Sequence, residues 1–199
     1  IEIKIKSKEF ICIVGPSGCG KTTLMNIIGG LIKGDGQKLL INNREIDENA
    51  NFGYVFQTSR LLPWLTLKEN VKLVCRQNSV EIDKKIKNLL TSFGLLEFID
   101  SYPNNISGGM RRKVSLARAF VNKPEILLMD EPFISLDQPT SENLYKVLVN
   151  YWQKNPTTII LITHNIKEAL LLGDRILFFS KRPGTVVVDY KNKCRRRSL

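Results

Sequence analysis

The sequence lacks an apolar run long enough to cross a bilayer. Spanning the hydrocarbon core takes about 20 predominantly apolar residues, and no run in these 199 residues approaches that length. Residues 1–6 alternate isoleucine with charged side chains, so they lack the continuous apolar segment of a secretory signal. We expect a protein that is made and kept in the cytoplasm, and the alternation predicts a half-exposed strand over residues 1–6.

Clusters of metal-binding side chains are also missing. The four cysteines are widely and irregularly spaced, and His164 is the single histidine. This inventory excludes a zinc or iron–sulfur framework and argues against a disulfide scaffold. Reduced thiols agree with the expected cytoplasmic location.

Acidic residues are scarce relative to basic ones. The 30 lysines and arginines outnumber 19 acidic residues and give a net charge of +11, which calls for an anionic partner: nucleotide, nucleic acid or an anionic membrane surface. Much of the excess lies in residues 181–197 and in Lys84, Lys85 and Lys87. The basic tail is either a solvated segment or a contact for lipid headgroups.

A glycine-rich stretch lies between two apolar runs, residues 10–14 and 24–28. It consists of Gly15, Pro16, Ser17, Gly18, Cys19, Gly20, Lys21, Thr22 and Thr23. The order strand, glycine loop, helix is the setting that a phosphate-binding loop requires. The alternative is a glycine-rich turn with an incidental lysine.

The spacing of this stretch fits the binding of a triphosphate. Backbone N–H groups can surround the anion only where side chains do not intrude, so we expect unusual backbone angles at Gly15, Gly18 and Gly20. The helix N-terminus adds its positive dipole end. Lys21 would reach the β- and γ-phosphates, and the Thr22 hydroxyl would ligate Mg²⁺. Thr23 would mainly cap the helix.

Hydrophobic patterns elsewhere indicate an α/β chain with a helical insert. We assign residues 1–57 and 123–199 to an ATP-binding core and residues 58–122 to a helical subdomain. Predicted strands cover 10–14, 38–41, 52–56, 126–129, 157–163, 175–179 and 185–190. Predicted helices cover 67–76, 82–93, 110–121, 140–153 and 168–172.

Polar side chains stand where several predicted strands end. Gln57, Asp130, Glu131 and His164 all occupy such positions, and parallel sheets bind ligands at the carboxyl ends of their strands. Asp130 directly follows four apolar residues, so its charge needs a partner such as Mg²⁺, and Glu131 is placed to polarise a water molecule. Taken singly, Asp130 could cap a helix, Glu131 could be a surface residue and His164 a structural one.

The motifs in this order resemble the nucleotide-binding subunit of an ATP-binding cassette (ABC) transporter. The resemblance rests on residues 15–22, Gln57, residues 106–110, residues 126–131, residues 136–137 and His164. It implies a P-loop NTPase core with a mainly parallel sheet, a small antiparallel edge and an inserted helical subdomain. Residues 61–66, 130–133 and 182–184 are most similar to importers of nitrate, sulfonate and taurine.

The resemblance also implies that the active protein is a dimer. Ser107, Gly108 and Gly109 open a helix and form a second anion site, which would contact the ATP bound to the glycine loop of another subunit. Asp137 would cross this interface. The alternative is that Ser107 simply caps a helix after a turn.

Roles in hydrolysis follow from the same resemblance. Glu131 would orient and polarise the attacking water, His164 would hold the γ-phosphate, and Gln57 would sense Mg²⁺, with Thr22 and Asp130 as its other ligands. A helix of a membrane partner would dock on residues 58–70. Trp64 and Leu65 would anchor it if they are exposed, although Trp64 could equally pack in the core.

Some positions depart from the family pattern. Ile106 replaces the usual leucine, and Ile134-Ser135 replaces a small pair before Leu136-Asp137. The family also carries an aromatic residue that stacks on adenine well upstream of the glycine loop, and Phe10 lies too close to the loop to replace it.

We therefore expect an ATPase subunit, with ATP and Mg²⁺ as cofactors, that powers an importer. Its expected partners are permease subunits, a second nucleotide-binding subunit and a solute-binding protein, and its expected place is the cytoplasmic face of the membrane. Two alternatives stay open: a soluble ABC ATPase acting on nucleic acid or ribosomes, and a regulatory cassette without turnover. We expect no nucleic-acid partner, because basic and aromatic residues are not interleaved as a nucleic-acid groove requires.

Overall fold

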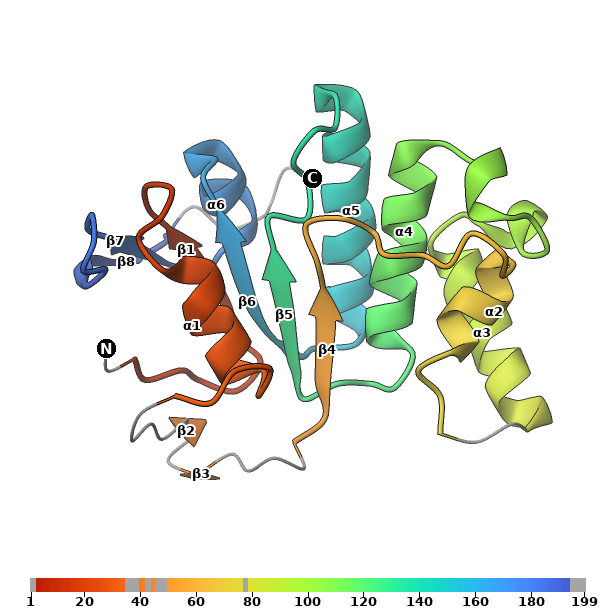
Figure 1. The fold of residues 1–199 in the computed structure, drawn as a ribbon, viewed down its shortest axis with the longest axis horizontal. Coiled ribbons are helices and arrows are strands. Elements are labelled where there is room, and N and C mark those ends of the chain that lie inside the picture. The colour runs from red at the N-terminus through yellow and green to blue at the C-terminus, as the bar shows by residue number, and fades with distance from the viewer. Residues whose placement is uncertain (1–2, 35–39, 42–43, 46–49, 77–78, 194–199) are drawn as a thin grey trace. The chain divides into compact units, whose positions relative to one another are not determined.

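The computed structural model describes residues 3–34, 40–41, 44–45, 50–76 and 79–193 (Figure 1). The chain divides into two compact units. One contains residues 1–54, 125–131 and 156–199, and the other contains residues 55–124 and 132–155. The division expected from the sequence, at residues 57 and 122, stays a prediction about folding subdomains. None of the helices in the described part of the chain combines the length and apolarity needed to span a bilayer.

The first unit is built on a mainly parallel sheet. Its six strands, counted over the described residues, lie in the order β4-β5-β6-β1-β7-β8 (Figure 1). The strands are β1 (Phe10–Val14), β4 (Phe52–Val55), β5 (Ile126–Asp130), β6 (Thr158–Thr163), β7 (Arg175–Phe179) and β8 (Val186–Lys191). β1 pairs in parallel with β6 and with β7, β5 pairs in parallel with β6, and β8 runs antiparallel to β7.

Nearly continuous apolar runs in the central strands give this sheet its core. β1, β5 and β6 are buried at every position, as expected for central parallel strands covered on both faces. Ile11, Ile13, Leu128 and Ile162 belong to one buried cluster, and Met25 of helix α1 (Lys21–Ile28) joins it. Helix α6 (Ile166–Leu172) packs against β1 and β6. A separate pair, β2 (Leu40–Ile41) and β3 (Arg44–Glu45), is antiparallel.

The second unit is helical in its described residues. It contains α2 (Leu67–Lys72), α3 (Val80–Ser92), α4 (Gly108–Phe120) and α5 (Gln138–Lys154), with short 3₁₀ helices at Leu96–Phe98 and Pro103–Asn105. α4 packs against α2, α3 and α5. Phe93, Phe120 and Tyr151 form an aromatic cluster with ring centroids 4.7 to 6.4 Å apart, and burial raises the pKa of Tyr151. This unit therefore has an apolar core of its own.

The structure confirms the α/β class and most predicted elements. The strand expected over 175–179 is β7 without change, and the helix expected over 110–121 begins two residues earlier, at Gly108. The strand predicted over residues 1–6 is wrong for residues 3–6, where only Ile5 makes a bridge; residues 1–2 lie outside the described residues, as do 38–39 of the strand predicted at 38–41. The helix predicted over 67–76 ends at Lys72.

The segment before α2 presents an exposed tryptophan on an ordered loop. Trp64 is 68% exposed, which excludes core packing for this residue. The side chain of Asn70 is fully buried beneath the loop. Its Nδ2 donates to the carbonyl oxygens of Leu62, Leu65 and Thr66 at 3.0 to 3.1 Å, and its Oδ1 accepts from Leu62 N at 2.8 Å. One amide therefore holds the backbone on both sides of Trp64.

Replacing Asn70 should loosen this loop. Asn70→Ala leaves a buried N–H and several carbonyl oxygens without partners, so we expect a loss of about 2 kcal/mol in the free energy of unfolding. Urea denaturation followed by circular dichroism measures the change, with the exposed Asn104→Ala as the control. Equal stability of the two variants would show that the Asn70 hydrogen bonds are not needed.

Candidate functional site

The glycine loop joins β1 to α1 in the first unit. Gly18 and Gly20 have φ values of 77° and 99°, which confirms the unusual backbone expected there. The same expectation is wrong for Gly15, whose φ is not positive. The reason for glycine at this position is close packing, because a Cβ atom would lie 2.9 Å from Cβ of Phe179 and 3.3 Å from Sγ of Cys19.

Helix α1 begins without a side-chain cap. Gly20 is the N-cap residue and no side chain bonds to the first turn, so the expectation that Thr23 caps the helix is wrong. Thr23 lies inside the first turn because the helix starts at Lys21. The first amides of a helix need acceptors, and an anion at this N-terminus would supply them. The loop therefore fits a phosphate group.

Lys21 and Thr22, at the start of α1, bond to two different segments. Lys21 is 7% exposed, and its Nζ donates to the carbonyl oxygens of Gly15 and Pro16, both at 2.8 Å. The Thr22 hydroxyl donates to Oδ1 of Asp130 at 3.3 Å. The structure thus brings together two of the three residues expected to hold Mg²⁺.

Asp130 is a buried carboxyl at the end of β5. It is 8% exposed. Burial raises its pKa, the hydrogen bond from Thr22 opposes that shift, and the neighbouring Glu131 charge adds to it. A carboxylate in such a position gains most from a cation. The hydroxyl and carboxylate oxygens of Thr22 and Asp130 are the hard donors that Mg²⁺ prefers, so these residues fit the ion.

Glu131 and His164 meet at the ends of β5 and β6. Nδ1 of His164 lies 3.5 Å from Oε1 of Glu131. Glu131 adopts a left-handed conformation with φ 42°, and its backbone N–H donates to the carbonyl oxygen of Ile162 at 3.0 Å. Positive φ is uncommon for residues other than glycine and is found where surrounding structure imposes it. The strained turn directs the Glu131 side chain toward His164.

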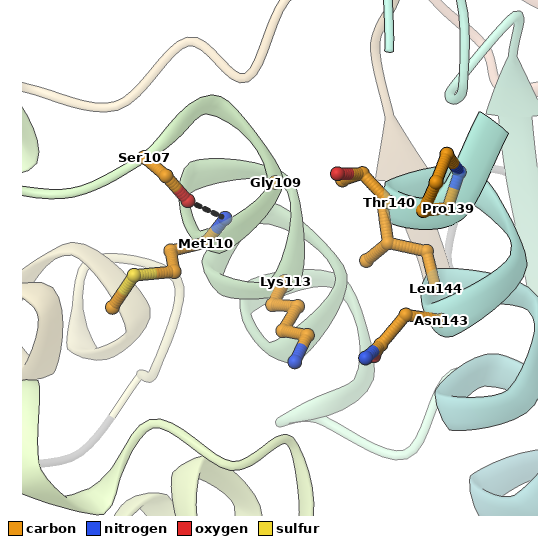
Figure 2. A pocket seen from close by; sticks show the side chains of 8 residues that line it. All are labelled: Ser107, Gly109, Met110, Lys113, Pro139, Thr140, Asn143 and Leu144. Carbon is orange, nitrogen blue, oxygen red and sulfur yellow. Dashed lines mark hydrogen bonds between the residues drawn. The ribbon is translucent and has the colours of Figure 1, made fainter. Parts of the chain in front are cut away.

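Ser107, Gly108 and Gly109 open helix α4 in the second unit. Ser107 is the N-cap, and its Oγ accepts from Met110 N at 3.2 Å (Figure 2). A Cβ atom on Gly109 would lie 2.5 Å from Cγ2 of Thr140, so α5 requires glycine there. Between α4 and α5 lies a pocket of about 310 Å³, into which Lys113 and Asn143 reach from facing helices (Figure 2).

Asp137 is the N-cap residue of α5. Its side chain accepts from Thr140 N at 3.1 Å, and the hydrogen bonds from Thr140 lower the pKa of Asp137. Asp137 therefore has a structural role in this chain. Its expected crossing to another subunit stays a prediction.

Gln57 belongs to the second unit, two residues beyond β4. Its side chain is exposed, and its expected place beside Mg²⁺ stays a prediction. Arg112 of α4 donates to the carbonyl oxygens of Phe56 and Gln57, and burial lowers the pKa of Arg112 to about 10. Arg118 donates to the carbonyl oxygens of Ser59 and Arg60 at 2.8 Å. Two arginines of the helix capped by Ser107 thus hold the backbone of residues 56–60.

Three structural features escaped the sequence reasoning. These are the arginine contacts of α4, the buried carboxyl of Glu168, and the turn between β7 and β8. In that turn a Cβ atom on Gly184 would collide with the carbonyl oxygen of Cys19. The dipeptide Pro183-Gly184 signals a turn, but the sequence does not show that the turn packs beneath the glycine loop.

A parallel sheet with an uncapped glycine loop and acidic strand ends defines a nucleotide-binding α/β protein. The sequence profile described as ABC transporter matches residues 1–134. The chain belongs to the ABC transporter family, whose ATP-binding subunits hydrolyse ATP.

Curated relatives and solved structures agree with this family. An aliphatic sulfonates import ATP-binding protein of Bacillus cereus is 39% identical, over 97% of this chain and 77% of the relative. A taurine import ATP-binding protein of Roseobacter denitrificans is 38% identical, over 96% of this chain and 73% of the relative. A dimeric post-hydrolysis ATP-binding cassette bound to ADP and Pi is 34% identical with a TM-score of 0.80, covering 96% of this chain and 88% of that one.

Adding a methyl group at Gly184 should disturb the glycine loop from below. Gly184→Ala drives a Cβ atom against the Cys19 carbonyl group, so the loop must shift. We expect ATP to bind about tenfold more weakly, equivalent to about 1.4 kcal/mol, as measured by isothermal titration calorimetry. Lys181→Ala, in the same turn but with an exposed side chain, is the control. Wild-type affinity in the Gly184 variant would show that the turn does not support the loop.

Proposed function

We propose that this chain is the ATP-hydrolysing subunit of an importer in the sulfonate and taurine group, and that two copies bind ATP between them. The observation that carries the proposal is the cluster in the first unit: an uncapped glycine loop, the Thr22–Asp130 hydrogen bond, and Glu131 beside His164. The import proteins among the relatives support the transport role.

The glycine loop binds the phosphates of ATP. Backbone N–H groups of the loop and of the first turn of α1 donate to phosphate oxygens, and Lys21 exchanges its contacts with the loop carbonyls for the β- and γ-phosphates. Thr22, Asp130 and Gln57 would hold Mg²⁺, which would supply positive charge to neutralise the phosphate oxygens. Pro16, Ser17 and Cys19 contribute backbone contacts.

Glu131 and His164 carry the hydrolytic step. Glu131 accepts a proton from the attacking water as general base. His164 donates a hydrogen bond to the γ-phosphate and orients Glu131 across the 3.5 Å contact. Both side chains start from fixed strand ends, so their geometry is set before ATP binds.

The second half of each nucleotide site comes from another copy. Ser107 and Gly108 are exposed at the N-terminus of α4, where an anion is favoured. The dimeric cassette that resembles this chain supports such an assembly. Asp137 then lies at the dimer interface, and each ATP is held by the glycine loop of one subunit and residues 107–109 of its partner.

The loop that presents Trp64 binds the permease. An exposed tryptophan on an ordered loop is the kind of apolar anchor that protein interfaces use, and Asn70 fixes the loop from below. Arg112 and Arg118 connect this region to α4, so movement of the docked partner reaches both Gln57 and Ser107. The subunit acts at the cytoplasmic face of the membrane, with a solute-binding protein completing the system.

Replacing the proposed general base should separate hydrolysis from binding. Glu131→Gln keeps the shape of the side chain but removes the proton acceptor, so we expect turnover to fall by at least about 100-fold. ATP should accumulate in a dimer of this variant, which size-exclusion chromatography with ATP detects. Wild-type turnover in Glu131→Gln would exclude Glu131 as the base and contradict the proposed site.

Removing the exposed tryptophan should break membrane attachment without harming ATP hydrolysis. We expect Trp64→Ala to lose co-purification with its co-expressed permease while the ATPase rate of the purified chain stays within about twofold of wild type. Tyr190→Ala, which removes another aromatic residue that is 42% exposed, is the control. Nuclease treatment before purification identifies any nucleic-acid partner, and membrane association that nuclease abolishes would contradict the proposal.

A further inference from the structure

Glu168 is a buried carboxyl in the first turn of α6. It is 6% exposed. Its Oε2 accepts from the Thr163 hydroxyl at 3.1 Å, and its Oε1 has no hydrogen-bond partner in the described part of the chain. Buried polar atoms without partners are rare in native structures and ask for an explanation. Burial raises the pKa of Glu168 to about 7, the bond from Thr163 opposes the shift, and the Glu131 charge adds to it.

Glu168 is connected to the loop that carries His164. The Thr163 hydroxyl donates to Glu168 and accepts from Asn165 N at 3.0 Å. Asn165 in turn caps α6, with its Oδ1 accepting from Lys167 N at 3.0 Å and Glu168 N at 3.3 Å. His164 therefore lies between two residues whose positions depend on one hydrogen-bond network, and that network ends at the Glu168 carboxyl.

Few other charges face this carboxyl. α6 packs against β1 and β6, whose residues 10–14 and 158–163 include no charged side chain and only Cys12 as a titratable one. Glu131, from the end of β5, is the charge that acts on Glu168. Lys167 and His164 belong to the same segment as Glu168, and both are exposed.

The geometry points to Glu168 as a positioning residue for ATP hydrolysis: through Thr163 it fixes the loop that carries His164, and its ionisation tightens that loop. This inference rests on the roles proposed above for Glu131 and His164. A hydrogen bond to an ionised carboxylate is shorter and about twice as strong as one to a neutral group. The loop is therefore held most firmly when Glu168 is charged, and more loosely when it is protonated.

The rate of ATP hydrolysis as a function of pH tests this role. We measure kcat and KM for MgATP between about pH 6 and about pH 9 for wild type, Glu168→Gln and Thr163→Val. In wild type, kcat rises as Glu168 ionises near neutral pH. In Glu168→Gln this rise disappears. Thr163→Val lowers kcat by about 10- to 100-fold through misplacement of His164, with KM unchanged because the glycine loop is intact.

Two results would overturn the inference. One is a pH profile of Glu168→Gln that superimposes on wild type. The other is a uniform loss of activity with an unchanged profile, which indicates a structural role only. Glu97→Gln, which removes an exposed carboxyl distant in sequence from Glu168, serves as the control. Absence of ATP hydrolysis in the wild-type chain would contradict the proposed function itself, so the two failures are distinguishable.

Folding stability gives a readout that does not depend on activity. The pKa of Glu168 is about 7 in the folded chain against an ordinary value of 4.5, so the folded state binds the proton more tightly than the unfolded state. The contribution of Glu168 to the free energy of unfolding of the wild type therefore falls as pH rises from 4.5 to about 7. In Glu168→Gln the denaturation midpoint should be higher than in wild type above neutral pH and similar below pH 4.5. A constant difference between the two proteins across this range would show that Glu168 does not titrate there, and would overturn the inference.

Discussion

The candidate site depends on close packing beneath the glycine loop. Backbone N–H groups can surround phosphate oxygens only if the loop stays open, and the loop has no strand ladder of its own to hold it. Here Gly15 packs against Phe179, the turn at Gly184 packs against the carbonyl group of Cys19, and Lys21 bonds to the carbonyl oxygens at the start of the loop. The ends of β1 and β7 thus support the glycine loop by close packing. The N-terminus of α1, which follows the loop, has no side-chain cap. Rigid support of this kind lets a site bind an anion without first paying to order its donors.

Close packing and buried hydrogen bonds are also concentrated around helix α4 in the second unit. The helix is capped by the exposed Ser107 and packs against α5 so closely that Gly109 has no room for a side chain. Its Arg112 and Arg118 hold the backbone of residues 56–60. Both guanidinium groups bond to carbonyl oxygens, and burial lowers the pKa of each. Buried cations are costly unless they are well bonded. Losing either arginine therefore affects the segment between Gln57 and Trp64 as well as the helix itself, which makes α4 the element that joins the proposed docking loop to the proposed anion site.

Local patterns in the sequence were enough to predict most strands, most helices and the polar side chains that stand at strand ends, because each depends on neighbours in the chain. The apolar run before Asp130 predicts a buried strand and a buried carboxyl, and both are observed.

Features that depend on distant residues were missed or misread. Gly15 was expected to need a special backbone angle, whereas its requirement comes from Phe179, and the cap expected at Thr23 is displaced because the helix starts at Lys21. The contact between Gly184 and Cys19 involves segments far apart in the sequence, which no local pattern records.

Three carboxyl groups near one end of the sheet explain why strain is concentrated there. Asp130 and Glu168 are buried, their pKa values are raised by burial, and the Glu131 charge adds to both shifts. Glu131 itself lies on a backbone with φ 42°. Each feature opposes folding, and the fully buried interiors of β1, β5 and β6 offset the cost.

Perturbed carboxyl groups gathered at strand ends are typical of sites that bind cations or move protons. A cation would relieve the charge of Asp130 directly, whereas within the described part of the chain the Glu168 carboxyl has only the Thr163 hydroxyl as a hydrogen-bond partner. If the proposed roles hold, bound ATP and Mg²⁺ would relieve the charge of Asp130 but not that of Glu168, so the loop that carries His164 would stay sensitive to the protonation of Glu168.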